Sequence, residues 1–286
     1  QRQMCIRDRP GPQPLAVPAS GTKRVGVFIG LSRYQDPGIR PLRVADLDAQ
    51  TVAQVMQELG QLDESVVLVN EQATLANVQQ LIQNGLPAAT RPGDLVLIYW
   101  SGHGGRTSNL DGTEPDGFDE YLIPYDGSLD PTAAVRQTML LDKTFGRWTL
   151  NLDGRTLVVI LDACHSGGQT QGAIKSIRGG DRATPFRDFF FASAFARAKD
   201  IGQRETAVLA SSRATQISFE QRGQSLSVMT HFLVEKLRSS TGPVSIQDVA
   251  AYVAQNVPSF VQEHYPGTTQ TPVFVDYTSP PVLLRP

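Results

Sequence analysis

Two short apolar runs constrain the fold of this chain more than any other feature. Residues 95–100 read Leu-Val-Leu-Ile-Tyr-Trp, and residues 157–161 read Leu-Val-Val-Ile-Leu. Such runs, with no polar residue at alternate positions, are typical of strands that are covered on both faces. Because strands of this kind occur almost only in parallel sheets with helices on each side, the two runs predict an α/β fold.

Strand and helix patterns alternate along the rest of the chain. Further strands are predicted at residues 25–29, 65–69, 207–210 and 273–275, and apolar residues at helical spacing predict helices within residues 52–59, 75–82, 226–237 and 246–257. Two stretches without a pattern, about residues 104–135 and 166–204, are expected to be long irregular loops. No linker interrupts the alternation, so we expect one domain over residues 22–277 with a mainly parallel sheet.

Both ends of the chain are expected to lie outside this domain. Residues 1–21 predict a disordered tail, and we exclude residues 1–9, which are basic and unpatterned, as sequence foreign to the domain. Residues 278–286 predict a C-terminal tail. The N-terminal tail lacks the apolar stretch of a signal peptide, and no run approaches the roughly 18 residues that span a bilayer. We therefore expect no membrane association, and leave open whether the chain is cytoplasmic or exported.

The composition excludes some classes of function and narrows the chemistry. With 26 Lys and Arg against 28 Asp and Glu, the net charge of −2 provides no field for nucleic acid. A hydrophobic fraction of 40% is that of a globular protein. Two cysteines cannot build a disulfide framework, and Cys5 lies in the tail. Cys164 is therefore the single thiol of the domain, where a lone cysteine is most often a small buried hydrophobe.

The two apolar strands are followed by similar polar motifs. The first leads into Ser101-Gly-His103-Gly104 and the second into Asp162-Ala-Cys164-His165. Ligands bind beyond the carboxyl ends of the strands in an open parallel sheet, which is where both motifs are expected. A nearby imidazole can take the proton of a thiol and make it a nucleophile. The pattern predicts His103 and Cys164 as a catalytic pair, with the N–H groups of Gly104 and Cys164 as an oxyanion hole.

The alternation of side chains along a strand adds an expectation about substrate. Residues two apart point to the same face, so Asp162 accompanies Cys164 and Ser101 accompanies His103 if both strands continue that far. A carboxylate beside the thiol raises the thiol pKa and so does not help to form the nucleophile. It is well suited to hold a cationic side chain of the substrate. These residues predict a cysteine hydrolase that cuts after Arg or Lys.

The paired motifs resemble those of the caspase-like cysteine peptidases, and most closely the metacaspases and their bacterial relatives, the orthocaspases. The resemblance covers roughly residues 23–276. It rests on Ser101-Gly-His-Gly104 and on Asp162-Ala-Cys-His-Ser-Gly-Gly168, and it is supported by Asp116-Gly-Phe-Asp-Glu120, by residues 208–216 and by Thr271-Pro-Val-Phe-Val275. A paired match of this kind is highly specific.

The resemblance implies a caspase-like three-layer α/β/α sandwich with a mainly parallel central sheet. It implies His103 as general base, Cys164 as nucleophile and a pocket that selects Arg or Lys. True caspases carry Gln at the position of Asp162 and cut after Asp, so the acid indicates a different specificity. The family also has an acid before Ala on its first helix, and Asp48 matches that place. Asp48 is therefore expected to join Asp162 and Ser101 in the substrate pocket.

The resemblance also bears on cofactors and partners. Many metacaspases need calcium, for which Asp119 and Asp142 are candidate ligands, but Gln171 and Leu141 stand where acids are implied. The acidic stretch of residues 111–120 lacks the spacing of an EF-hand loop, so we expect no cofactor and leave calcium open as an alternative. The expected partners are proteins or peptides with Arg or Lys at the cleavage site. The metacaspases that the chain resembles act as monomers, which implies a monomer here.

The loop after the predicted nucleophile contains seven basic residues. They are Lys175, Arg178, Arg182, Arg187, Arg197, Lys199 and Arg204. An ordinary exposed loop would account for them. Since each also offers the predicted cleavage residue, residues 172–205 are a candidate self-processing segment.

Simpler interpretations exist for several of these residues. His103 alone would be read as a core histidine, and Asp48 as a helix cap or solvated acid. Zinc bound by His103, Cys164 and Asp162 is a weaker alternative, since three mixed ligands form no known motif. The three other histidines, His165, His231 and His264, are expected to have packing or incidental roles. The acids of residues 111–120 are expected to form a solvated loop.

Two alternative functions remain open at this point. One is another hydrolase or a transpeptidase of the same clan. The other is a catalytically silent caspase-like module that binds partners. Loss of His103 or Cys164 would have indicated the binding module, and both residues are present.

Overall fold

The computed structural model describes residues 21–108, 117–129, 135–165, 205–212, 216, 218–221 and 225–286. The described strands are β1 (Arg24–Gly30), β2 (Glu64–Val69), β3 (Leu95–Ser108), β4 (Phe118–Leu122), β5 (Leu140–Leu141), β6 (Thr156–His165), β7 (Thr206–Ala210), β8 (Val244–Ser245), β9 (Val273–Asp276) and β10 (Leu283–Arg285). The helices are α1 (Ala45–Leu59), α2 (Leu75–Gln79), α3 (Leu86–Ala89), α4 (Val135–Thr138), α5 (Asp142–Trp148), α7 (Val228–Ser239) and α8 (Ile246–His264). Short turns of 3₁₀-helix lie at Asn70–Gln72 and Thr149–Leu152, and a π-helical turn lies at Gln80–Gly85.

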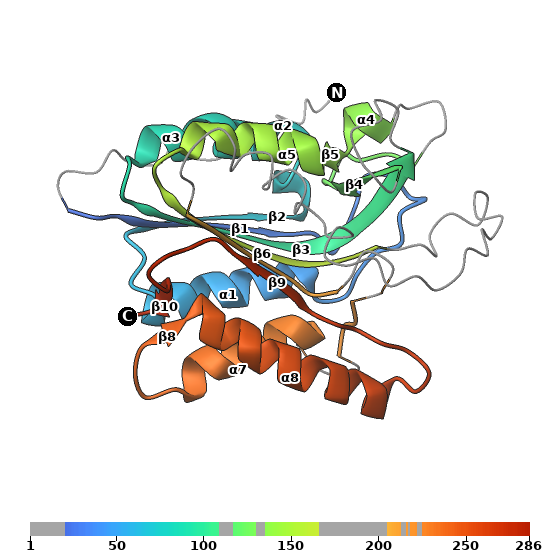
Figure 1. Cartoon of the computed structure of the whole chain (residues 1–286). Helices are drawn as coiled ribbons and strands as arrows, with labels where there is room; N and C mark the ends of the chain where they lie inside the picture. Colours follow the sequence, from blue (N-terminus) through green and yellow to red (C-terminus); the bar gives the residue numbers. More distant parts are fainter. Residues whose placement is uncertain are drawn as a thin grey trace, which may run out of the picture.

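A mainly parallel sheet with the strand order β2-β1-β3-β6-β7-β9 forms the middle layer. All neighbours in this order are parallel except β9, which runs antiparallel to β7. Helices α2, α3 and α5 cover one face, and α1, α7 and α8 cover the other (Figure 1). The predicted α/β/α sandwich is therefore confirmed.

The two apolar runs form the centre of this sheet and supply both hydrophobic cores. In β3, Val96, Ile98 and Trp100 pack into the core under α2 and α5, while Leu95, Leu97 and Tyr99 pack into the core under α1, α7 and α8. The residues of β6 alternate in the same way. Because both faces of the central strands are buried, no polar residue interrupts either run.

The structure differs from the sequence prediction in the region after Gly104. Residues 104–135 were expected to form an irregular loop, but β3 continues to Ser108 and pairs with the antiparallel strand β4. A side chain at Gly105 would clash with its cross-strand partner, since its Cβ would lie 2.6 Å from the ring of Tyr121. The glycine that suggests a loop thus accommodates a strand pairing with an aromatic neighbour. The other expected loop, residues 166–204, lies outside the described residues.

The ends of several elements also differ from the sequence prediction. Helix α8 continues through Pro258 to His264, beyond the predicted end at residue 257. The residues expected as a C-terminal tail, 278–286, include β10, which pairs with β8 and buries Leu284 completely. No helix within the described residues has both the length and the apolar character required to cross a membrane.

Candidate active site

The carboxyl ends of β3 and β6 bring the two sequence motifs together. The strands pair in parallel over ten residues, with Ser101 opposite Asp162 and His103 opposite Cys164. Strand geometry persists through Cys164, as the sequence argument requires, since β6 ends at His165. The side chains of Cys164 and His165 lie outside the described part of the structure, so their placement is given by the main chain alone. Gly104, the expected oxyanion residue, lies between Leu122 of β4 and His165 of β6.

The His103 imidazole is buried and held by the main chain of a loop. Its exposed fraction is 3%, and its Nε2 lies 2.8 Å from the carbonyl oxygen of Arg40. Because a carbonyl only accepts hydrogen bonds, Nε2 carries the proton and the lone pair of the neutral ring is on Nδ1. Burial lowers the pKa of His103, an effect that the bond to the Arg40 carbonyl opposes and the Arg40 charge assists. The neutral form required of a general base is therefore favoured.

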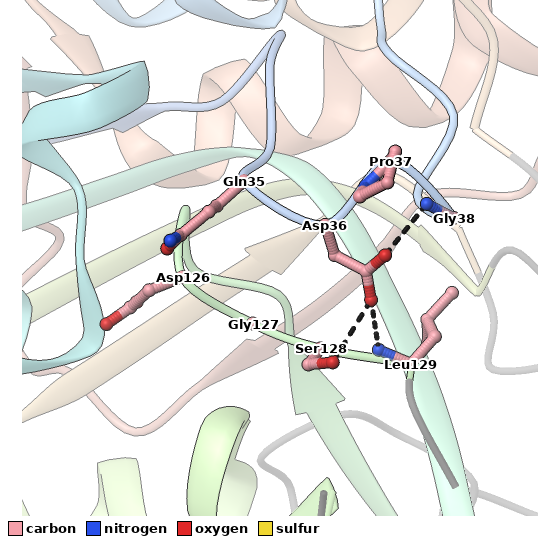
Figure 2. Close-up of a pocket in the computed structure, with 8 residues that line it drawn as sticks. All are labelled: Gln35, Asp36, Pro37, Gly38, Asp126, Gly127, Ser128 and Leu129. Carbon is pink, nitrogen blue, oxygen red and sulfur yellow. Dashed lines mark hydrogen bonds between the residues drawn. The ribbon is translucent and has the colours of Figure 1, made fainter.

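In the loop that supplies the Arg40 carbonyl, residues 31–44, the carboxylate of Asp36 makes several hydrogen bonds. Asp36 accepts hydrogen bonds from the main-chain N–H of Gly38 at 2.8 Å and of Leu129 at 2.7 Å, and from the Ser128 hydroxyl at 3.1 Å (Figure 2). A cavity of about 620 Å³ lies between residues 35–38 and 126–129. Asp36 thus connects the loop after β1 to the segment that follows β4.

The expected pocket residue Asp48 lies in the first turn of α1 and is fully buried. Its Oδ2 accepts hydrogen bonds from the hydroxyls of Ser101 at 2.8 Å and Ser227 at 2.5 Å. Its Oδ1 accepts the main-chain N–H of Ser227 at 2.9 Å. The structure therefore brings Asp48 and Ser101 together, and it adds Ser227, the residue that precedes α7.

Asp162 has a similar environment on the neighbouring strand, with an exposed fraction of 4%. Its Oδ1 accepts the Ser218 hydroxyl at 2.7 Å, and its Oδ2 accepts the hydroxyl of Thr230 at 2.7 Å and its N–H at 3.2 Å. The Thr230 oxygen also lies 2.6 Å from the Tyr99 hydroxyl. Every oxygen of the two acids thus accepts at least one hydrogen bond.

The two carboxyl groups influence one another. Burial, and after it the neighbouring charge of Asp162, raise the pKa of Asp48 to about 8 against the opposing hydrogen bonds from Ser227 and Ser101. Burial also raises the pKa of Asp162. Two buried carboxylates so close together do not both ionise readily, so the pair holds a proton near neutral pH. A cation entering between them would favour release of that proton.

The candidate calcium ligands do not form a calcium site in the described part of the chain. Asp119 is fully buried, and its Oδ1 forms an ion pair with Lys143 Nζ at 2.9 Å. Asp142 is also buried, whereas Leu141 packs in an apolar cluster. No three His, Cys, Asp or Glu side chains of the described residues gather as a metal ion requires. The Lys143 ammonium group already neutralises Asp119. Asp119 and Asp142 as placed here therefore do not fit a calcium ion, and calcium has no part in the reaction proposed below.

The two remaining described histidines have local contacts. His231 lies on α7 with its ring edge-on to Phe232 at 5.1 Å. His264, at the end of α8, stacks on Phe260 at 4.0 Å and contacts the Phe260 carbonyl through Nδ1.

Several site residues were not predicted from the sequence. Ser227 is recognisable as a residue before a helix, but nothing indicates its bond to an acid 179 positions away. Ser218, Thr230 and Tyr99 carry no local signal for their contacts around Asp162. They were missed because these contacts arise when α7, which carries Thr230, and the segment around Ser218 pack against β3 and β6.

A mainly parallel α/β/α sandwich with His103 and Cys164 on adjacent strand ends is the arrangement of a caspase-like protein. Comparisons with known proteins give the same class. The Caspase domain family matches residues 23–280, so the chain belongs to that peptidase family. It is 30% identical over 171 residues to Metacaspase-1A of Aspergillus terreus and 32% identical over 172 residues to Metacaspase-1 of Botryotinia fuckeliana. Each alignment covers 54% of this chain, and it spans only 40% and 38% of those relatives.

Solved structures show the same fold. A protein of Geobacter sulfurreducens superposes with a TM-score of 0.62 at 23% identity, covering 90% of this chain and 94% of that one. Caspase-1 of Spodoptera frugiperda superposes with a TM-score of 0.60 at 14% identity, covering 92% of each chain. The resemblance to caspase-like proteins, first based on two short motifs, is thus confirmed over most of the chain.

Proposed function

We propose that this chain is a cysteine endopeptidase that cleaves after Arg or Lys. The observation that carries the proposal is the register of β3 and β6, which sets His103 opposite Cys164 and Ser101 opposite Asp162. His103 and Cys164 supply a base and a nucleophile, and Ser101 and Asp162 lie beside Asp48, the buried acid of α1. Membership of the Caspase domain family supports the same chemistry.

In the proposed reaction, the Cys164 sulfur attacks the carbonyl carbon of the scissile bond while His103 Nδ1 takes the thiol proton. The N–H groups of Gly104 and Cys164 stabilise the negative oxygen of the tetrahedral intermediate. The C–N bond then breaks, and His103 returns the proton to the leaving amine. Water, deprotonated by the same imidazole, hydrolyses the thioester and regenerates the thiol.

Specificity is proposed to come from Asp48, Asp162 and Ser101. A guanidinium or ammonium group would bind between the two acids, which share a proton before it arrives and lose that proton to solvent on binding. Each carboxylate oxygen has a second lone pair, so the present hydroxyl donors need not all leave. Because both acids are almost inaccessible, side chains at the mouth of the pocket must move to admit the cation.

The direct test uses fluorogenic peptides that end in Arg, Lys, Asp or Asn, assayed with and without calcium. We expect cleavage after Arg and Lys only, and none with the Cys164→Ala variant. Preference for Asp would contradict the proposed pocket. Inactivity towards all four peptides would favour a silent binding module.

Self-processing within residues 172–205 is part of the proposal. All but the last of these residues lie outside the described residues, so the support is the sequence of seven basic positions after the nucleophile. Purified protein and its Cys164→Ala form are incubated together and separately. Fragmentation is expected only where Cys164 is present, and equal fragmentation of both forms would contradict self-processing.

A further inference from the structure

The main chain of His103 lies beside a position that β1 does not reach. β1 pairs with β3 as far as Gly30 opposite Ser101, and Leu31 N–H donates to the Ser101 carbonyl at 3.0 Å. Main-chain groups two residues apart on a strand point to the same neighbour, so the N–H of His103 also points towards the β1 side. The chain has turned away there, and the hydroxyl oxygen of Tyr34 accepts this N–H at 2.8 Å.

Tyr34 is itself held in place by several contacts. Its hydroxyl donates to the Leu31 carbonyl at 3.2 Å, and its ring lies 5.3 Å from the His103 imidazole at an interplanar angle of 30°. A Cβ at Gly102 would lie only 3.2 Å from the Tyr34 hydroxyl oxygen. The glycine between Ser101 and His103 therefore gives the hydroxyl space to approach the strand.

The loop that carries Tyr34 also carries the carbonyl that binds the His103 ring. Residues 31–44 are anchored at their start by Asn70, whose side-chain oxygen accepts the N–H groups of Ser32 at 2.9 Å and Arg33 at 3.0 Å. Beyond Tyr34, Asp36 provides the second anchor, described above (Figure 2). One braced loop thus contacts both the main chain and the ring of the proposed base.

We propose that Tyr34 is a positioning residue for His103. By accepting the main-chain N–H of His103, Tyr34 holds the ring so that Nε2–H stays bonded to the Arg40 carbonyl and the lone pair stays on Nδ1. The inference rests on the proposed function, in which Nδ1 takes the thiol proton. Tyr34 contacts no reacting atom and acts only through His103. Catalytic groups tolerate little displacement, and an error of about 1 Å can cost roughly 100-fold in rate.

The test measures the tautomer of His103 without requiring activity. Protein with Cys164→Ala and ¹⁵N-labelled histidine is examined by NMR, in which the imidazole ¹⁵N shifts report which nitrogen carries the proton. We expect only the Nε2–H tautomer of His103 with Tyr34 present, and a measurable Nδ1–H population with Tyr34→Phe. In the protein with Cys164, Tyr34→Phe should lower kcat by about 10- to 100-fold with KM unchanged.

Two further variants make the result decisive. Tyr252→Phe removes a tyrosine hydroxyl that donates to Glu235 Oε2 at 2.9 Å between α8 and α7, and should change neither the tautomer nor kcat. In Gly102→Ala the new Cβ would lie 3.2 Å from both the Tyr34 hydroxyl oxygen and Trp100 Nε1, so a shift of the hydroxyl by a few tenths of an ångström should change the tautomer and kcat in the same direction as Tyr34→Phe. A single Nε2–H tautomer and unchanged kcat in the folded Tyr34→Phe variant would overturn the inference. If the protein with Cys164 and Tyr34 cleaves no peptide, the proposed function fails, while NMR still decides the role of Tyr34.

Discussion

Asp48 and Asp162 are both bound at the start of helix α7, by the residue that precedes it and by its third residue. Asp48 accepts the N–H of Ser227 at 2.9 Å, and Asp162 accepts the N–H of Thr230 at 3.2 Å. These N–H groups belong to the start of a helix, where no carbonyl of the same helix can accept them. The partial positive charge at this helix end also favours nearby carboxylates. The two proposed specificity residues are therefore at the same time the cap of α7.

Loss of the Asp162 charge should impair cleavage after Arg. The Asp162→Asn variant keeps an acceptor oxygen for Thr230 but removes the charge that the substrate cation would meet. We expect kcat/KM for an Arg peptide to fall by about 100- to 1,000-fold, the range for loss of a buried charge partner. Asp276→Asn, an exposed change on β9, is the matched control. Cleavage of the Arg peptide by Asp162→Asn within tenfold of the unchanged protein would place the pocket elsewhere.

The buried pair should make the stability of the unliganded protein fall with rising pH. The pKa of Asp48 in the folded protein, about 8, lies above its ordinary value of 3.8. Between these two pH values the folded state therefore binds more protons than the unfolded state. This contribution is fully present below the unfolded pKa and is lost as the pH rises through the folded pKa. We expect the melting temperature to decrease between pH 5 and 8, by about 2–4 °C for each kcal/mol lost. The decrease should be smaller in Asp48→Asn, and identical pH profiles would contradict the coupling.

Binding of a cationic ligand should release a proton. A guanidinium between the acids favours their ionised forms, so affinity should increase with pH, by at most about tenfold per pH unit. The measurement is fluorescence anisotropy of a labelled peptide ending in Arg, bound to the Cys164→Ala protein at pH 6, 7 and 8. A peptide ending in Gln is the control, for which no such increase is expected. Equal affinity of the Arg peptide at all three pH values would show that no proton is displaced.

The close contact of α1 with β1 should not tolerate a larger residue at Gly30. A Cβ at this position would lie 2.4 Å from the Ala45 carbonyl oxygen and 2.7 Å from the Ala49 Cβ. Gly30→Ala should therefore displace the start of α1, which carries Asp48, and destabilise the fold by about 1–3 kcal/mol. Urea unfolding measures this change. Gly242→Ala, with no atom within 4 Å of the new Cβ, should cost much less, and equal costs would contradict the packing argument.

The sequence was most informative where burial leaves a local pattern. The apolar runs in β3 and β6 predicted the sheet, because both faces of these strands are covered. The alternation rule, which placed Ser101 with His103 and Asp162 with Cys164, requires strand geometry to persist through these residues, and β3 and β6 do continue past them. The pairing of β3 with β4 was missed, since Gly104 and Gly105 carry no strand signal of their own.

The supports of the site could not be predicted in the same way. Tyr34 reaches the His103 main chain because Asn70 and Asp36 fix its loop, and none of these residues has a recognisable spacing to His103. Thr230 meets Asp162 only because α7 docks on the sheet. Such contacts depend on how whole elements pack, and a local pattern does not encode them.

The capping of α7 by two acids has a consequence for how substrate preference can change. An apolar or basic residue in place of Asp48 or Asp162 would alter the charge of the proposed pocket and would also remove an acceptor for the Ser227 or Thr230 N–H. Only an amide side chain removes the charge and keeps an acceptor oxygen, so any other change of the preferred cleavage residue would require the beginning of this helix to be rebuilt in the same step. Under the proposed specificity, the residues that select the substrate also hold the start of α7, so few single substitutions could change the preferred substrate without disturbing the fold.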